Sequence, residues 1–172
     1  MTHQVTAKQN NSQMCFVCGM KNPHGLGASF FELDNGELLG IFEPGEEFQG
    51  YPERLHGGIA ATILDETIGR AILIAQQEVW GVTVEFTTRY RKPVPLGEKI
   101  HVVGRIERDR RRLFQGTGEI LLPDGEVAVE GKGRYLKIPL DEITEVDTGE
   151  MEWKVVPDPD DPQTFSYSHP RE

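Results

Sequence analysis

The chain has 172 residues, of which 37% are hydrophobic, which suits one ordinary globular domain and is short for two. Its formal net charge of −10 argues against a general binder of nucleic acid or anionic membranes, because such partners would be repelled at long range. No stretch reaches the length of a membrane-spanning helix, and residues 1–13 lack the apolar core of a signal peptide, so we expect a cytoplasmic protein without a membrane partner.

The N-terminal segment, residues 1–27, is predicted to be an arm. Residues 1–13 are polar, and we expect them to be loose. The following stretch, CFVCGMKNPHGLG, is rich in glycine and is punctuated by Pro23, which indicates turns. Two apolar runs, ASFFEL and ELLGIFEP, then flank Asp34-Asn35-Gly36, and an Asn-Gly pair between such runs predicts a β-hairpin.

A long helix is predicted over residues 58–76. Nearly every residue there is Ala, Ile, Leu or Thr, and a helix that is apolar nearly all round is typically buried. After the helix, apolar residues recur at every second position in WGVTVEFTTRYRKP, where Val82, Val84 and Phe86 alternate with polar residues. That alternation predicts a strand with one apolar face and one wet face, with Thr83 on the wet face.

Three further strand segments follow, KIHVVGRIE, LFQGTGEILL and VAVEGKGRYLKI, and their short connections predict an antiparallel meander. The pattern is α+β: a curved antiparallel sheet of about six strands with one long central helix, over residues 28–138. Residues 139–172 are acidic and proline-rich, which predicts a disordered or draped extension. One helix cannot cover both faces of such a sheet, so the other face needs solvent or a second subunit, and self-association is expected.

Two adjacent acids in the predicted helix differ in their surroundings. Residues three and four positions apart share a helix face, so Glu66 can pair with Arg70. The corresponding neighbours of Asp65 are all unable to pair with a carboxylate: Ala61, Ile68, Gly69 and Ile72. We therefore expect Asp65 to have a raised pKa or to meet a partner from another element.

The helix is preceded by a glycine pair, Gly57-Gly58. The first N–H groups of a helix have no intrahelical acceptor, and glycine lets a ligand oxygen approach them closely. Such donors can polarise a carbonyl and hold a developing oxyanion. The alternative, which the residues leave open, is a tight corner at the glycines and a structural role for Asp65.

Three segments resemble one family. His56-Gly57-Gly58, followed after six residues by Asp65, resembles the active-site signature of hotdog-fold acyl-CoA thioesterases. CFVCGMKNPHGLG and VEFTTRYRKPVPLGE are similar to the lead-in and to the strand and turn after the helix in the same proteins. The resemblance runs from about residue 15 to 138 and points to the PaaI-like branch of the 4-hydroxybenzoyl-CoA thioesterase superfamily.

The resemblance implies a hotdog fold and hydrolysis of an acyl-CoA to the free acid and coenzyme A, without a metal or cofactor, in a homodimer or homotetramer. The Gly58 N–H would bind the thioester carbonyl. Asp65, contributed across the dimer interface, would be the general base that activates water, or the nucleophile. His56 would orient the thioester or leaving group, and Thr83 would help to place the water. Gly57 and Glu66, beside these residues, are further substrate-binding candidates.

Two other readings of the function stay open. One is a hotdog protein that binds acyl-CoA without turnover, as a carrier or sensor. The other is a hydratase or dehydratase on the same fold, although the separate Asp/His pair that hotdog hydratases use is not found. The acyl group itself cannot be inferred, because the resemblance implies a pocket lined by two chains.

Basic residues gather at two places in this acidic chain. Arg110, Arg111 and Arg112 follow Arg108 at a predicted hairpin tip, which is either a solvated turn or a cradle for the phosphates of coenzyme A. Further phosphate-binding candidates follow the helix: Arg89, Arg91 and Lys92.

Cys15 and Cys18 are the only cysteines, in a Cys-x-x-Cys arrangement. A zinc site would need ligands from a second subunit or from His24, since zinc takes four. A redox motif is a second possibility, and a packed or loop-capping pair is the interpretation that we favour.

Overall fold

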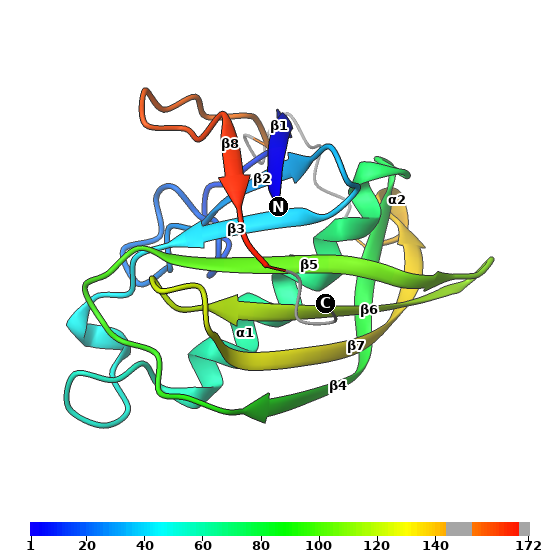
Figure 1. The fold of residues 1–172 in the computed structure, drawn as a ribbon. Coiled ribbons are helices and arrows are strands. Elements are labelled where there is room, and N and C mark those ends of the chain that lie inside the picture. The colour runs from blue at the N-terminus through cyan, green and yellow to red at the C-terminus, as the bar shows by residue number, and fades with distance from the viewer. Residues whose placement is uncertain (144–152, 169–172) are drawn as a thin grey trace.

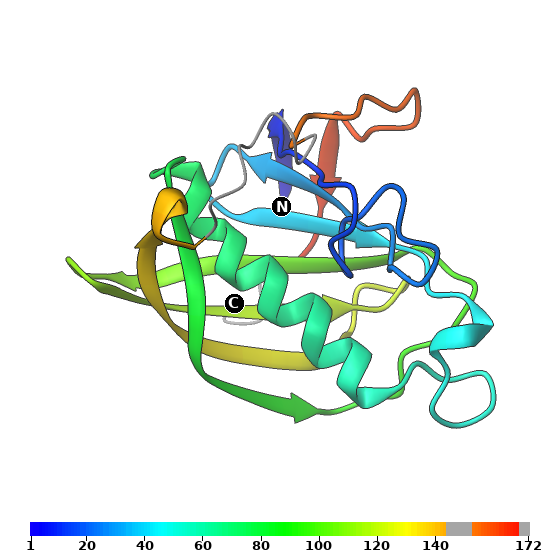
Figure 2. The same cartoon turned by 180° about the vertical axis from the view of Figure 1, so that it is seen from behind.

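One antiparallel sheet curves around a single long helix in the computed structural model, which describes residues 1–143 and 153–168 (Figures 1 and 2). The helix is α1 (Gly57–Arg70), continued by the 3-10 turn η2 (Ala71–Ile74). The described strands are β1 (Thr2–Lys8), β2 (Ser29–Leu33), β3 (Leu38–Phe42), β4 (Val79–Tyr90), β5 (Ile100–Asp109), β6 (Leu113–Leu121), β7 (Val127–Pro139) and β8 (Thr164–Ser166). Their order across the sheet is β4-β7-β6-β5-β3-β2-β1-β8. Two short helices, η1 (Glu46–Phe48) and α2 (Leu140–Ile143), complete the described elements, and no described helix could cross a membrane.

The six predicted strands and the central helix are confirmed, but the sheet has two further strands. The expectation that residues 1–13 are loose is wrong for β1, which pairs with β2 through Val5 and Leu33 and with β8 through His3 and Phe165. Composition could not reveal this strand, because its stability comes from partners distant in sequence. The division at residues 27/28 and 138/139 stays a prediction. Residues 144–152 and 169–172 of the predicted extension lie outside the described residues.

Part of the sheet face remote from α1 is covered by the chain's own ends (Figure 1). Tyr167 is buried there with Phe31, Leu39 and Val103, and Phe165 packs against the same cluster. We expected solvent or a second subunit on this face, and did not consider that the C-terminal segment of the same chain could cover part of it. The described part of the C-terminal segment is draped over the sheet, one of the two states expected for it.

Glycines let α1 lie close to the sheet. Ile68, which is fully buried, sits over Gly116 and Gly118 of β6. A Cβ atom built at Gly118 would lie 2.5 Å from the Val103 carbonyl oxygen and 2.9 Å from Cγ1 of Ile68. This close approach places the middle of α1 against the sheet and fixes the position of its side chains.

The strand β4 forms one edge of the sheet and contains a bulge. Thr83 is opposite Tyr135 and Glu85 is opposite Arg134, so Val84 is an extra residue. A bulge reverses the alternation of faces along a strand. As a result Val82 and Val84 are 40% and 58% exposed, and the prediction that they share a buried face with Phe86 is wrong.

Candidate active site

The start of α1 is capped by His56. Its Nδ1 accepts a hydrogen bond of 2.9 Å from the Gly58 N–H, and the Tyr90 hydroxyl donates to the Gly57 carbonyl at 2.7 Å. The glycine pair therefore does begin the helix, but in this structure the Gly58 N–H already has an acceptor. A neutral imidazole that accepts at Nδ1 carries its proton on Nε2, so exposed His56 offers a second donor at the helix start.

Asp65 finds partners on the sheet rather than on its helix. Its carboxylate accepts hydrogen bonds from Thr83 Oγ1 at 3.0 and 3.1 Å and from the Tyr135 hydroxyl at 3.1 Å. Burial raises the pKa of Asp65, the charge of Glu66 adds to the rise, and both hydroxyl groups oppose it. Both parts of the expectation for Asp65 are confirmed: its pKa is raised, and its partners come from other elements.

Glu66 is held in the ion pair that the helical spacing predicts. Arg70 Nε lies 2.6 Å from Glu66 Oε1, and the Arg70 side chain is only 7% exposed. The two neighbouring acids therefore differ as expected: Glu66 neutralises a buried cation, and Asp65 faces no cation among the groups that shift its pKa. Asp65 is therefore the acid of this pair that lacks a neutralising cation.

Tyr135 was not identified from the sequence. Its ring is fully buried in β7 and stacks on Phe114, with the ring centroids 4.8 Å apart. Burial, and then the charge of Asp65, raises the pKa of Tyr135, so the phenol stays protonated and donates. The available signal was a tyrosine on the helix-facing side of a predicted strand, because a buried phenol usually finds an acceptor.

A cleft opens beside Asp65, with about 460 Å³ of empty volume that includes space open to solvent. Its walls come from α1, η2, β4 and the C-terminal segment: Asp65, Glu66, Gly69, Arg70, Leu73, Trp80, Gly81, Thr83 and Trp153. The indoles of Trp80 and Trp153 lie 5.2 Å apart, centroid to centroid, so part of the wall is aromatic. A ligand in this cleft would meet an apolar surface next to a half-buried carboxylate.

The other candidates at the helix start lie away from this cleft. Gly58 and Asp65 are seven residues apart on one helix, which corresponds to about 10 Å along its axis. His56, Gly57 and Gly58 do not line the cleft. The single chain therefore brings Asp65 and Thr83 together and keeps Gly58 and His56 apart from them.

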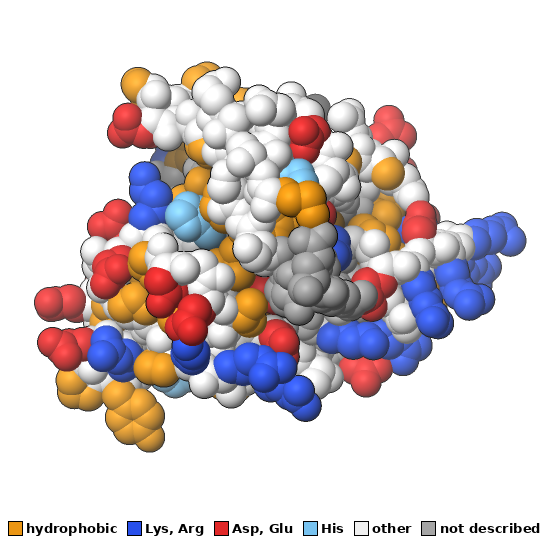
Figure 3. Space-filling view, viewed as in Figure 1, with side chains coloured by type: hydrophobic (Ala, Val, Ile, Leu, Met, Phe, Trp, Pro, Cys, Tyr) orange, Lys and Arg blue, Asp and Glu red, His pale blue; other side chains and the backbone are white. Residues whose placement is uncertain are grey.

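The basic candidates form two groups at opposite ends of the sheet. Arg110, Arg111 and Arg112 are exposed at the β5–β6 turn, where the preceding Asp109 contacts Gln76 beyond η2 (Figures 1 and 3). Arg89, Arg91 and Lys92 lie at the end of β4, near the start of α1. Within that second group, Arg91 pairs with Glu130 at 2.9 Å and Lys92 pairs with Glu126.

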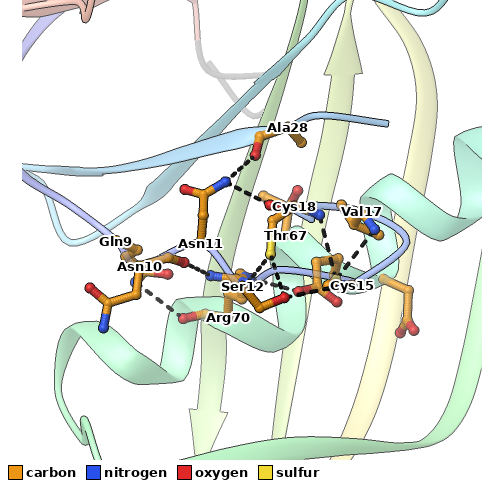
Figure 4. Close-up of polar contacts among 12 residues, drawn as sticks. Gln9, Asn10, Asn11, Ser12, Cys15, Val17, Cys18, Ala28, Thr67 and Arg70 are labelled. Carbon is orange, nitrogen blue, oxygen red and sulfur yellow. Dashed lines mark hydrogen bonds and ion pairs between the residues drawn. The ribbon is translucent and has the colours of Figure 1, made fainter. Parts of the chain in front are cut away.

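Cys15 and Cys18 lie against the C-terminal half of α1 (Figure 4). Cys18 is buried in the main hydrophobic core, and Cys15 Sγ accepts from the N–H groups of Val17 and Cys18. This arrangement is the packed, loop-capping pair that we favoured. The two sulfurs and a Glu66 oxygen lie within 4.8 Å of one another, and His24 is not part of this group.

Comparison with known proteins links this geometry to one family. Residues 53–129 match the family model described as the thioesterase superfamily, a range that holds His56, Gly58, Asp65 and Thr83 but not Tyr135. Acyl-coenzyme A thioesterase THEM4 of Mus musculus is 32% identical over 118 residues, 66% of this chain and 50% of that protein. Acyl-coenzyme A thioesterase 13 of Homo sapiens is 28% identical over 78 residues, 45% of this chain and 56% of that protein. The chain spans about half the length of these curated relatives.

Solved structures share the fold. A crystal structure of a thioesterase superfamily protein superimposes with a TM-score of 0.66 at 29% identity, covering 71% of this chain and 59% of that one. The E. coli PaaI protein from the phenylacetic acid degradation operon gives a TM-score of 0.60 at 16% identity, covering 66% of this chain and 80% of that one. The second likeness concerns the fold alone, which is the α+β hotdog arrangement.

Proposed function

We propose that this chain is a hotdog-fold thioesterase that hydrolyses an acyl-CoA thioester to the free acid and coenzyme A, because residues 53–129 match the thioesterase superfamily model and a thioesterase superfamily protein shares its fold. The observation that carries the proposal is the state of Asp65. A half-buried carboxylate with a raised pKa, held by two hydroxyl groups at the wall of a cleft, suits a general base. Named relatives that are acyl-coenzyme A thioesterases support the same reaction class.

In the proposed reaction, Asp65 takes a proton from a water molecule as the water oxygen attacks the thioester carbonyl carbon. Thr83 and Tyr135 hold the carboxylate in place, and the Thr83 hydroxyl lines the cleft where that water would lie. The carbonyl oxygen gains negative charge, and the tetrahedral intermediate then breaks its carbon–sulfur bond. Coenzyme A leaves as a thiolate, or as a thiol after taking up the proton that Asp65 removed from water.

The oxyanion requires donors, and the two that the resemblance implies, at Gly58 and His56, do not line the cleft of one chain. The Gly58 N–H and His56 Nε2–H are the proposed donors, provided by a second copy of the chain, since about 10 Å of helix separates Gly58 from Asp65 in the same copy. His56 would turn away from the Gly58 N–H to release it for the carbonyl oxygen. In this proposal the oxyanion accepts two hydrogen bonds, one from the backbone N–H of Gly58 and one from the ring N–H of His56.

The edge strand β4 is the proposed contact between copies. None of the other described strands pairs with its outer side, and Val82 and Val84 expose apolar surface next to Thr83. A long unpaired edge with exposed apolar residues favours pairing with another strand. A dimer formed there would bring residues of a second copy to the cleft.

The phosphates of coenzyme A are proposed to lie near exposed guanidinium groups. Arg110, Arg111 and Arg112 suit this role better than Arg91 and Lys92, because the last two already pair with glutamates. Guanidinium groups bind phosphate oxygens in pairs, and a local basic patch offsets the net charge of −10. Arg89 remains a further candidate.

The direct test is release of free coenzyme A from a panel of short, medium, long and aromatic acyl-CoAs. Turnover of at least one of them, in protein without added metal or cofactor, is the expected result, and the preferred acyl group defines the substrate class. Tight binding of an acyl-CoA by calorimetry with no release from any member of the panel would contradict hydrolysis and support the non-catalytic carrier or sensor.

Thr83 should set the acid limb of the pH–rate profile. The hydroxyl of Thr83 lowers the pKa of Asp65, so its loss in Thr83→Val raises that pKa further and moves the acid limb to higher pH. We expect kcat at the original optimum to fall about tenfold, the usual effect of losing one hydrogen bond to a charged group. The measurement is kcat/KM against pH for the wild type and the variant.

Thr83→Ser is the matched control, because it keeps the hydroxyl and removes only a methyl group. Its acid limb should coincide with that of the wild type. A limb that moves equally in both variants would show that the methyl group, and not the hydrogen bond to Asp65, matters at this position.

A further inference from the structure

The sulfurs of Cys15 and Cys18 accept hydrogen bonds. Cys15 Sγ accepts from the backbone N–H groups of Val17 at 3.3 Å and Cys18 at 3.4 Å (Figure 4). Cys18 Sγ accepts from Arg70 Nη2 at 3.0 Å and lies 3.9 Å from Ser12 Oγ. Donors directed at sulfur stabilise a thiolate, which is the reactive form of cysteine.

The pKa values of the two thiols are shifted in opposite directions. The hydrogen bond from Cys15, supported by the charge of Arg70 and opposed by burial, lowers the pKa of Cys18 to about 6. The same hydrogen bond, together with burial, raises the pKa of Cys15. Cys18, which also receives the guanidinium contact, is therefore the member of the pair that ionises more readily.

Arg70 supplies a positive charge beside Cys18 and Glu66. Its guanidinium contacts Glu66, Cys18 Sγ and the Asn10 carbonyl oxygen, and it lies over the rings of Phe30 and Trp153 at 4.6 and 4.9 Å. Among the described residues, the group of Cys15, Cys18 and Glu66 gains no fourth His, Cys, Asp or Glu ligand. A fixed cation and an incomplete ligand set argue against zinc and leave the thiols available for their own chemistry.

We propose that Cys15 and Cys18 are a redox-active dithiol, a modification site that a hydroperoxide oxidises to an intrachain disulfide. The Cys18 thiolate attacks one peroxide oxygen, the O–O bond breaks, and hydroxide leaves, which forms a sulfenic acid at Cys18. The Cys15 sulfur then attacks the Cys18 sulfur, the S–O bond breaks, and water leaves with the proton of Cys15. The hydroxide takes up a proton from solvent, so the cysteine pair loses two electrons and hydrogen peroxide is reduced to two molecules of water.

The burial of Cys18 indicates which class of oxidant reaches it, and its contact with Arg70 links its oxidation to the cleft. Cys18 is only 1% exposed, so a small peroxide suits the site better than a bulky disulfide. The loop is held in position by Asn11, whose Nδ2 donates to the carbonyls of Cys18 and Ala28. Oxidation removes the negative charge beside Arg70, and Arg70, Glu66 and Trp153 all line the cleft that holds Asp65.

Two readouts test the proposal without any activity assay. The chain has only two cysteines, so titration of free thiols in the folded protein reports this pair alone. Stoichiometric hydrogen peroxide should remove both thiols and two hydrogen atoms of mass, and dithiothreitol should restore them. Both tryptophans line the cleft, so their fluorescence should change with oxidation and return on reduction.

Single-cysteine variants test the order of the steps. In Cys15→Ser, the sulfenic acid at Cys18 has no resolving thiol and should be trapped by dimedone. In Cys18→Ser, labelling of Cys15 should be about tenfold weaker, since its sulfur lacks the guanidinium contact. Equal labelling of the two variants would overturn the assignment of Cys18 as the attacking thiolate.

The wild-type protein alone can overturn the proposal, so the test does not depend on the variants folding. Two free thiols that persist under peroxide would overturn it. One equivalent of zinc bound by the purified protein, released together with the appearance of two reactive thiols, would do the same and identify a metal site. An unchanged tryptophan signal in the fully oxidised protein would overturn the link from the dithiol to the cleft.

Discussion

Replacing Asp65 by asparagine is expected to lower kcat by about 100-fold to 10,000-fold, the usual contribution of a general base. The amide cannot accept the proton of the attacking water, although its oxygen can still accept from Thr83 or Tyr135. Affinity for the acyl-CoA should be retained, because the cleft keeps its shape. The measurement combines single-turnover hydrolysis with calorimetric binding of the substrate that the panel identifies.

The stability of the same variant provides an internal check. The folded-state pKa of Asp65 is raised, so its ionised form costs folding free energy above that pKa, and the cost disappears as the pH falls through it. Asp65→Asn should therefore be at least as stable as the wild type at neutral pH, and this advantage should vanish in acid. A loss of activity with an unchanged or higher melting temperature separates catalysis from folding.

Glu66→Gln is the matched control for the neighbouring acid. It removes the ion pair with Arg70 but leaves Asp65 and its hydroxyl partners in place. Its kcat should stay within about tenfold of the wild type. A larger fall in kcat for Glu66→Gln than for Asp65→Asn would contradict our proposal and identify Glu66 as the general base.

Gly118→Val is expected to destabilise the protein by about 3 kcal/mol, because the new side chain has no space. Its Cβ atom alone would lie 2.5 Å from a backbone oxygen of β5, and Ile68 of α1 lies above it. The helix would have to lift from the sheet, which also displaces Asp65. Thermal unfolding at fixed protein concentration should show a melting temperature lower by roughly 6 to 12 °C.

Thr117→Val on the same strand is the control for Gly118→Val. Thr117 precedes Gly118, so its side chain points to the other face of the sheet, and its hydroxyl makes only an exposed contact of 3.4 Å with Glu107. Its effect should stay within about 0.5 kcal/mol. Equal destabilisation by the two substitutions would show that valine in β6, and not the contact with α1, is the cause.

Local patterns in the sequence were sufficient to predict the central helix and six strands, and to distinguish the surroundings of Asp65 from those of Glu66. Alternation of apolar residues, the Asn-Gly turn and the apolar helix depend on neighbours a few positions away, and the structure confirms the elements that they predicted. The ion pair of Glu66 with Arg70 depends on a spacing of four residues, which a helix converts directly into contact. The isolation of Asp65 on its own helix follows from the same spacing.

The partners of Asp65 depended on the register between distant strands. A bulge at Val84 turns Thr83 toward α1, and no alternation rule locates a bulge from one strand alone. Tyr135 meets Asp65 across 70 residues of sequence, and β1 meets β8 across most of the chain. The cap of Gly58 by His56 is local, yet it depends on a ring orientation that residue spacing does not fix.

The sequence by itself therefore determined the central helix, six of the eight described strands and which carboxylate lacks a local partner. Only the tertiary structure decided what surrounds that carboxylate: two hydroxyl groups, an aromatic cleft and the buried Arg70 that also contacts Cys18. The physical reason is the range of the interactions. Helical and strand periodicity acts over a few residues, whereas burial, strand register and the pKa of Asp65 depend on segments that meet only when the chain folds.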